Sequence, residues 1–252
     1  MRKPLIAGNW KMNKTIVQAA DFAEKLKAKF SEYRQREILL FPGYTLLKHV
    51  SDILADTFIK VGAQNFYPER QGAFTGEISY TQLLELCLSH VLIGHSERRT
   101  IFNESGEMIN KKVCTAIEKG LSPVLCVGET IEQKKALKTR DVLQTQIKEA
   151  LKGLSVETGR FLTIAYEPVW AIGTGLVAQN EEIQQGHAFI RSLIFDLFDG
   201  DTAENVRILY GGSVKPENIS SIMQNRDVDG VLVGGAALDI EKFSQIISYG
   251  DK

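Results

Sequence analysis

The chain has 252 residues and a formal net charge of −1, so it carries no basic field that would attract nucleic acid or an anionic membrane. Hydrophobic residues make up 44% and charged residues 24%, as in ordinary globular proteins. Its three widely spaced cysteines argue against a disulfide framework. The apolar runs are too short for a secretory or membrane-spanning segment. We therefore predict a soluble, cytoplasmic protein that binds neither nucleic acid nor membrane.

Short apolar, β-branched runs alternate along the chain with longer amphipathic segments. The segments 16–30 and 183–197 place apolar residues three or four positions apart, which predicts helices. The expected strands are Leu5–Ala7, Ile38–Phe41, Ile59–Ala63, Val91–Gly94, Val124–Val127, Leu162–Tyr166, Ile208–Tyr210 and Gly230–Val233. Apolar strands separated by helices predict a parallel sheet. Eight such units fit a single closed (β/α)8 barrel over residues 1–252 better than the alternative, an open sheet of eight strands.

The residues directly after the predicted strands are rich in glycine and in chemically capable side chains. In chain order they read GNWK, FPG, QNFYPE, GHSE, GET, YEP, GGS and GGAA. Ligands of parallel α/β folds bind at the carboxyl ends of the strands. We therefore expect the functional site at this end of the barrel, because the amino ends carry no comparable concentration of such residues.

Asn9 and Lys11 follow the first predicted strand in AGNWKMNK. A lysine at this place is most often a surface charge. It could instead supply a fixed positive charge for an anionic, oxygen-rich ligand, or form a Schiff base with a carbonyl substrate. The residues alone leave these three interpretations open.

His95 ends the fourth predicted strand in IGHSERR, and Ser96–Glu97 begin a short helical turn. The positive end of a helix dipole disfavours imidazolium, so we expect a neutral ring that donates a hydrogen bond to a substrate oxygen. No two histidines have zinc-site spacing with a third ligand, so we expect no metal. The other histidines are interpreted as structural residues on or beside helices: His49, His90 and His187.

Glu167 ends the sixth predicted strand in AYEPVWAIGTGL, where Pro168 restricts its backbone. A strand-end glutamate alone more often caps a turn or pairs with a cation. Here it lies at the root of an apolar, glycine-containing loop that can close over a small ligand and exclude water. Closure would desolvate the carboxylate and raise its pKa, as suits a general base. The predicted lid is Pro168, Val169, Trp170, Ala171, Ile172, Gly173, Thr174 and Gly175.

Two glycine pairs, Gly211–Gly212 and Gly234–Gly235, follow the seventh and eighth predicted strands. Alone they indicate only tight turns. After these two strands of a barrel, however, backbone N–H groups commonly hold a phosphate. No GxxxxGK[ST] loop is present, so a small phosphorylated metabolite is favoured over a nucleoside triphosphate.

These motifs together resemble the triosephosphate isomerase family. The similar segments are GNWKMNK, GAQNFYPERQGAFTGE, IGHSERR, VLCVGE, AYEPVWAIGTG, YGGSV and VGGAAL, in the family's order over positions 8 to 238. The resemblance implies a single (β/α)8 TIM barrel. It further implies a glycolytic and gluconeogenic enzyme that interconverts dihydroxyacetone phosphate and D-glyceraldehyde 3-phosphate without a cofactor or metal.

The resemblance also implies roles for individual residues. Glu167 would move a proton between adjacent carbons through an enediolate, and neutral His95 would donate to the carbonyl oxygens. Lys11 and Asn9 would stabilise negative charge, and Glu97 would order this cluster. The phosphate would be held by backbone N–H groups around Gly173, Ser213, Gly234 and Gly235.

The connection 65–77 is longer than a usual βα loop, which suggests a function. In the family this loop inserts into a second subunit, so the resemblance implies a homodimer in which Thr75 supports the partner's active site. Leu176–Val177 replace a common Lys-Thr pair at the lid's second hinge, which bears on its closing rate.

Two other functions are weighed against this one. An aldolase-like barrel would use Lys11 as a Schiff-base lysine. A barrel retained only for binding should have lost a member of the set Asn9, Lys11, His95 and Glu167, yet all four are present.

Overall fold

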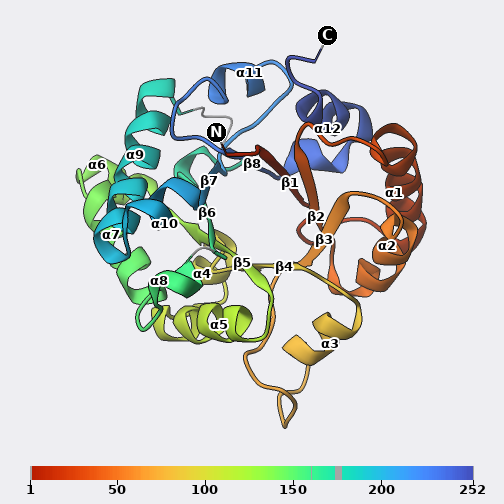
Figure 1. Ribbon diagram of the computed structural model, residues 1–252, viewed down its shortest axis with the longest axis horizontal. Coiled ribbons are helices and arrows are strands. Elements are labelled where there is room, and N and C mark those ends of the chain that lie inside the picture. The colour runs from red at the N-terminus through yellow and green to blue at the C-terminus, as the bar shows by residue number, and fades with distance from the viewer. Residues whose placement is uncertain (1, 160, 174–177, 252) are drawn as a thin grey trace.

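The computed structural model describes residues 2–159, 161–173 and 178–251. Within these ranges, eight parallel strands close into a barrel in the order β1 to β8, and helices surround it (Figure 1). The (β/α)8 prediction is therefore confirmed, and the open sheet is wrong. The strands are β1 (Leu5–Asn9), β2 (Glu37–Phe41), β3 (Ile59–Ala63), β4 (His90–Ile93), β5 (Ser122–Val127), β6 (Thr163–Tyr166), β7 (Arg207–Tyr210) and β8 (Gly230–Val233).

The predicted strand boundaries are close, with one informative difference at β4. Gly94 lies outside the strand because its φ of 69° is in the left-handed region that glycine adopts without strain. His90 lies inside the strand, where it pairs with Ser122 of β5, and not on or beside a helix as expected.

Several helices begin at side-chain caps, and most bury one face against the barrel. Thr15 and Gln18 form a capping box at the start of α1, whose buried face includes Phe22 and Leu26. No helix in the described ranges is long and apolar enough to cross a membrane. The α-helices are α1 (Ile16–Phe30), α2 (Leu47–Leu54), α3 (Tyr80–Glu85), α4 (Ser96–Thr100), α5 (Gly106–Glu118), α6 (Ile131–Lys135), α7 (Thr139–Ala150), α8 (Val156–Gly159), α9 (Asn180–Leu197), α10 (Gly200–Asn205), α11 (Ile219–Ile222) and α12 (Ile240–Ile247); 3₁₀ turns are η1 (Tyr44–Leu46), η2 (Val169–Ala171) and η3 (Gly235–Leu238).

Two apolar layers hold the fold together. A large cluster packs the helices against the outer side of the strands. A smaller cluster contains residues from alternate strand positions, as expected for side chains that fill the barrel interior. It consists of Leu5, Ala7, Leu39, Phe41, Leu92, Val124, Cys126, Ala165, Leu209 and Leu232. Cys87, Cys114 and Cys126 are all free thiols, and only Cys126 is buried.

The seam between β1 and β8 leaves no room for a side chain at Gly230. Its φ is 150°, and a Cβ added there would lie 2.0 Å from the carbonyl oxygen of Leu5. The backbones of the first and last strands therefore meet directly, which closes the barrel.

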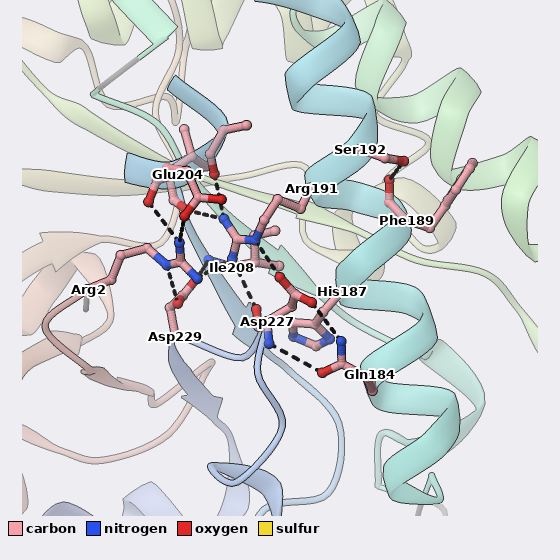
Figure 2. Close-up of polar contacts among 12 residues, drawn as sticks. Arg2, Gln184, His187, Phe189, Arg191, Ser192, Glu204, Ile208, Asp227 and Asp229 are labelled. Atoms are coloured by element: carbon pink, nitrogen blue, oxygen red, sulfur yellow. Dashed lines mark hydrogen bonds and ion pairs between the residues drawn. The ribbon is translucent and has the colours of Figure 1, made fainter. Parts of the chain in front are cut away.

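The amino end of the barrel holds a buried ionic cluster that the sequence analysis did not single out (Figure 2). The Arg191 side chain on α9 donates at 2.7 Å to Asp227 and at 2.7 Å to Asp229. It also donates to the carbonyl oxygens of Ala203 and Val206. Arg2 adds a second guanidinium on Asp229, just before β1. These contacts join the chain's first residues to α9 and to the start of β8.

Candidate active site

A cavity of about 760 Å³ lies at the carboxyl ends of the strands, the end at which the sequence predicts the functional site. Its lining residues come mostly from the ends of β1 and β8 and from the segments that follow β1, β4, β6, β7 and β8. The structure thus brings together side chains more than 150 positions apart in the sequence. Among the predicted site residues, the cavity is lined by Asn9, Lys11, His95, Glu167, Ile172, Gly173, Ser213, Gly234 and Gly235.

Glu167 follows β6 and is 2% exposed. Its Oε1 lies 3.0 Å from Nε2 of His95, and its Oε2 accepts the backbone N–H of Ser96 at 3.1 Å. Burial alone would raise the pKa of Glu167, but His95 and the Ser96 N–H outweigh burial and lower it overall. The expected rise in pKa is therefore absent in this arrangement, because both carboxylate oxygens have partners.

His95 caps the amino end of α4, as the short helical turn after it predicts. Its Nδ1 accepts the backbone N–H of Glu97 at 3.2 Å, which leaves Nε2 to carry the proton and face Glu167. This is the tautomer expected of a neutral donor. Burial lowers the pKa of His95, but the nearby Glu167 carboxylate raises it overall.

Lys11 lies after β1 with a φ of 52°, a conformation that a non-glycine residue rarely adopts. Asn9 holds it by accepting the Lys11 N–H at 3.0 Å. Gln64, which the sequence analysis did not single out, donates to the carbonyl oxygens of Lys11 at 2.8 Å and Phe41 at 2.9 Å. The Lys11 ammonium lies 2.5 Å from a carboxylate oxygen of Glu97. Three polar residues, Asn9, Gln64 and Glu97, therefore define where this cation lies.

The glycine-rich segments after β7 and β8 form another part of the cavity wall. The backbone N–H of Gly211 is bonded to the carbonyl oxygen of Tyr166 at 2.8 Å, so Gly211 shapes the wall without offering its own donor. Gly173 joins this wall from the predicted lid, with a φ of 68° in the left-handed region. A small anion inside the cavity would face backbone, as an anion-binding nest requires.

The first six residues of the predicted lid, 168–173, are anchored to the barrel through Trp170. Trp170 donates from Nε1 to Glu129 at 2.7 Å, and the Tyr166 hydroxyl donates to the same carboxylate at 3.1 Å. Lys134 lies over the Trp170 ring at 3.4 Å from its centroid. Glu129 stands out in the sequence only as part of the segments GET and VLCVGE. Thr174, Gly175 and Leu176–Val177 lie outside the described residues.

Thr75 lies away from this cavity. It is exposed on the loop between β3 and α3, which projects from the barrel at the bottom of Figure 1. Within the loop the rings of Tyr67 and Phe74 lie 4.3 Å apart. Thr75 is not among the residues that line the cavity of its own chain.

The site has the features of an enzyme that transfers protons on a small anionic substrate. A buried carboxylate pairs with a histidine, a lysine lies beside them, and backbone-rich loops line the same cavity. Among the described residues, no group of three or more His, Cys, Asp or Glu could hold a metal ion.

Comparison with known proteins identifies the family. The family model described as triosephosphate isomerase matches residues 4–250. The chain is 49% identical over 249 residues to the triosephosphate isomerase of Syntrophotalea carbinolica, covering 99% of both chains. It is 47% identical over 251 residues to that of Finegoldia magna, covering 99% of this chain and 100% of the relative. The chain therefore belongs to the triosephosphate isomerase family.

Proposed function

We propose that Glu167 is the general base with which this isomerase interconverts dihydroxyacetone phosphate and D-glyceraldehyde 3-phosphate. It removes a proton from the carbon beside the carbonyl, which leaves an enediolate, and returns the proton to the neighbouring carbon. The observation that carries this proposal is the contact of a buried carboxylate with His95 inside the cavity, at 3.0 Å. A positioned base contributes about 10²–10⁴-fold to a rate.

His95 and Lys11 stabilise the charge that develops on the substrate oxygens. When Glu167 turns from His95 to the substrate carbon, the charge that raises the pKa of the ring moves away, and the neutral ring donates from Nε2. Lys11 supplies a cation whose position is set by Asn9 and Glu97. Each preorganised donor contributes about 3–4 kcal/mol at such a site.

The phosphate binds to backbone N–H groups around Gly173, Ser213, Gly234 and Gly235, which line the cavity. Its binding energy favours closure of the lid 168–175 over the reacting carbons. Closure excludes water and protects the enediolate from losing phosphate. The base and its cover are parts of one segment, so they move into place together.

The ion pair between Lys11 and Glu97 disfavours the aldolase-like alternative. An ammonium held by a carboxylate at 2.5 Å has no lone pair with which to attack a carbonyl carbon. Borohydride treatment in the presence of a triose phosphate distinguishes the two chemistries. Proton transfer leaves no covalent adduct, whereas a trapped adduct on Lys11 would contradict our proposal.

The Glu167→Gln variant tests the base directly. We expect its kcat in a coupled isomerase assay to fall by about 10³-fold or more, while a non-reactive phosphorylated analogue still binds, because the phosphate contacts are intact. Glu217→Gln is the matched control, since Glu217 is an exposed acid on the rim of the same cavity. Near-normal turnover in Glu167→Gln would overturn the assignment.

We further propose that residues 1–252 form one catalytic domain that works in the cytoplasm as a glycolytic homodimer, without a cofactor. The projecting loop that carries Thr75 supports the dimer, as do the exposed side chains of Met12 (98%), Ile101 (66%) and Phe102 (64%), which follow segments of the site. Sedimentation equilibrium of Thr75→Arg tests this: we expect monomers of low activity, whereas Ser220→Arg on α11 should leave the dimer intact. A Thr75→Arg protein with unchanged mass and activity would contradict the dimer loop.

A further inference from the structure

We propose that Gln146 on α7 is a positioning residue for Glu167, and that it acts through the backbone of Gly128. The proposal rests on the proposed role of Glu167 as the base. Gln146 lies on a helix outside the barrel and is not among the residues that line the 760 Å³ cavity, so it acts without touching substrate.

A single side-chain amide holds both backbone polar groups of Gly128. The N–H of Gly128 donates to Oε1 of Gln146 at 2.8 Å, and Nε2 of Gln146 donates to the Gly128 carbonyl oxygen at 3.1 Å. Both contacts are partly buried. A two-point contact of this kind fixes the position and the tilt of one peptide segment, which a single hydrogen bond would not do.

Gln146 takes the place of a neighbouring strand. The ladder between β4 and β5 ends at the pair Ile93 and Leu125, because β4 turns away at Gly94. The chain after β5 then faces a cavity of about 170 Å³ that Gln146 also lines. Without a side chain from α7, the backbone of Gly128 would face this cavity with unpaired polar groups, which is costly.

Gly128 is in direct backbone contact with Glu167. A Cβ on Gly128 would lie 1.7 Å from the Glu167 carbonyl oxygen, so the two main chains touch and only glycine fits. On either side of Gly128, the Val127 carbonyl oxygen accepts the N–H of Glu167 at 2.7 Å, and the Glu129 carbonyl oxygen accepts the N–H of Val169 at 3.0 Å. The segment 127–129 is therefore the surface on which the base and the first hinge of the lid rest.

A shift of Gly128 is consequently transmitted to Glu167. The contact between Gly128 and Glu167 lies at the end of the cavity that holds the catalytic base, whereas the phosphate-facing loops follow β7 and β8. Loss of the Gln146 contacts should therefore reduce kcat and leave the binding of the phosphate nearly unchanged. Displacement of a reacting group by about 1 Å can cost on the order of 10²-fold in rate.

Gln146→Met tests the proposal, because methionine fills a similar volume without hydrogen-bonding to Gly128. We expect kcat to fall ten- to a hundredfold with KM within about twofold. Gln144→Met, a half-buried position on the same helix, is the matched control and should keep wild-type kcat. Gln146→Glu retains an acceptor for the Gly128 N–H but loses the donor when ionised, so its kcat should be intermediate.

The double variant separates positioning from a merely structural role. If Gln146 acts by placing the base, Gln146→Met should cause no further loss of kcat, within about twofold, in a Glu167→Gln background. Equal fold-losses in both backgrounds, unchanged kcat in Gln146→Met, or failure of both Gln146 variants to fold would overturn the proposal. Near-normal turnover in Glu167→Gln alone would instead contradict the role of the base.

Discussion

The two ends of the barrel both hold buried charged groups, but these groups are bound in different ways. At the carboxyl end, Glu167 has two hydrogen-bond partners, lines an open cavity and has a partner, His95, that can also serve a ligand. At the amino end, the guanidinium of Arg191 contacts two carboxylates and three carbonyl oxygens (Figure 2). Groups with exchangeable partners suit catalysis, and groups whose partners are all internal suit stability.

A second group at the amino end follows the same rule. Glu37 begins β2 and lies within 3.1 Å of both Lys60 and Arg207. Burial raises the pKa of Glu37, but these two cations outweigh it and lower the pKa to about 2. The carboxylate therefore stays charged and paired over the whole physiological range. The comparison predicts that substitutions at the amino end reduce stability and those at the carboxyl end reduce turnover.

The largest expected effect is that of Arg191→Met. It removes the guanidinium shared by the buried Asp229 and the partly buried Asp227, so the free energy of unfolding should fall by about 3–5 kcal/mol. Urea denaturation measures this, and kcat of the folded fraction should be unchanged. The neighbouring exposed Arg226→Met should shift stability by no more than about 0.5 kcal/mol. A fall in kcat without a fall in stability would break the comparison.

The next effect is that of Lys11→Met at the opposite end. Loss of the fixed cation should lower kcat/KM by about 10²–10³-fold. Stability should change by no more than about 1 kcal/mol, because the pair with Glu97 is partly exposed. Lys215→Met, which removes an exposed lysine on the rim of the same cavity, should keep most of the activity. Steady-state kinetics and thermal unfolding of both variants measure these two effects, and an equal loss of kcat/KM in both would contradict the prediction.

The smallest expected effect concerns pH. Burial, with Lys60 nearby, lowers the pKa of His90 to about 4 from an ordinary 6.5. As the pH falls from 6.5 toward 4, the unfolded chain therefore binds this proton before the folded chain does. The free energy of unfolding falls by about 3 kcal/mol across that window. His90→Gln should remove this part of the pH dependence in urea titrations at pH 7 and 5, whereas His49→Gln on α2 should not. If the free energy of unfolding changed with pH equally in wild type and His90→Gln, the pKa of His90 would not be lowered in the folded protein.

Much of the fold was predictable because its signals are local. Apolar runs predict the eight strands, and the 3.6-residue period predicts the helices between them. Because residues after the strands gather at the carboxyl end of a parallel barrel, Glu167, His95 and Lys11 are then expected at one cavity. The direction of the Glu167 pKa was not predictable, since it depends on the Ser96 N–H and His95, which approach only in the folded chain.

No local sequence pattern indicated the ionic cluster at the amino end or the two glutamines, Gln64 and Gln146, that bind backbone groups near the site. Arg191 lies in HAFIR and Asp229 directly before β8, 38 positions apart, with no spacing that marks them as partners. Gln64 and Gln146 bind carbonyl and N–H groups, which every residue possesses, so the sequence cannot indicate which ones they meet.

The seam at Gly230 has a consequence for variation of the chain. Since a methyl group at this position would overlap the Leu5 carbonyl oxygen, every amino acid other than glycine would force the first and last strands apart. A library of all twenty amino acids at position 230, selected for folded protein, should therefore return glycine alone. A larger residue at this position cannot be used to widen the barrel and make room for bulkier interior side chains.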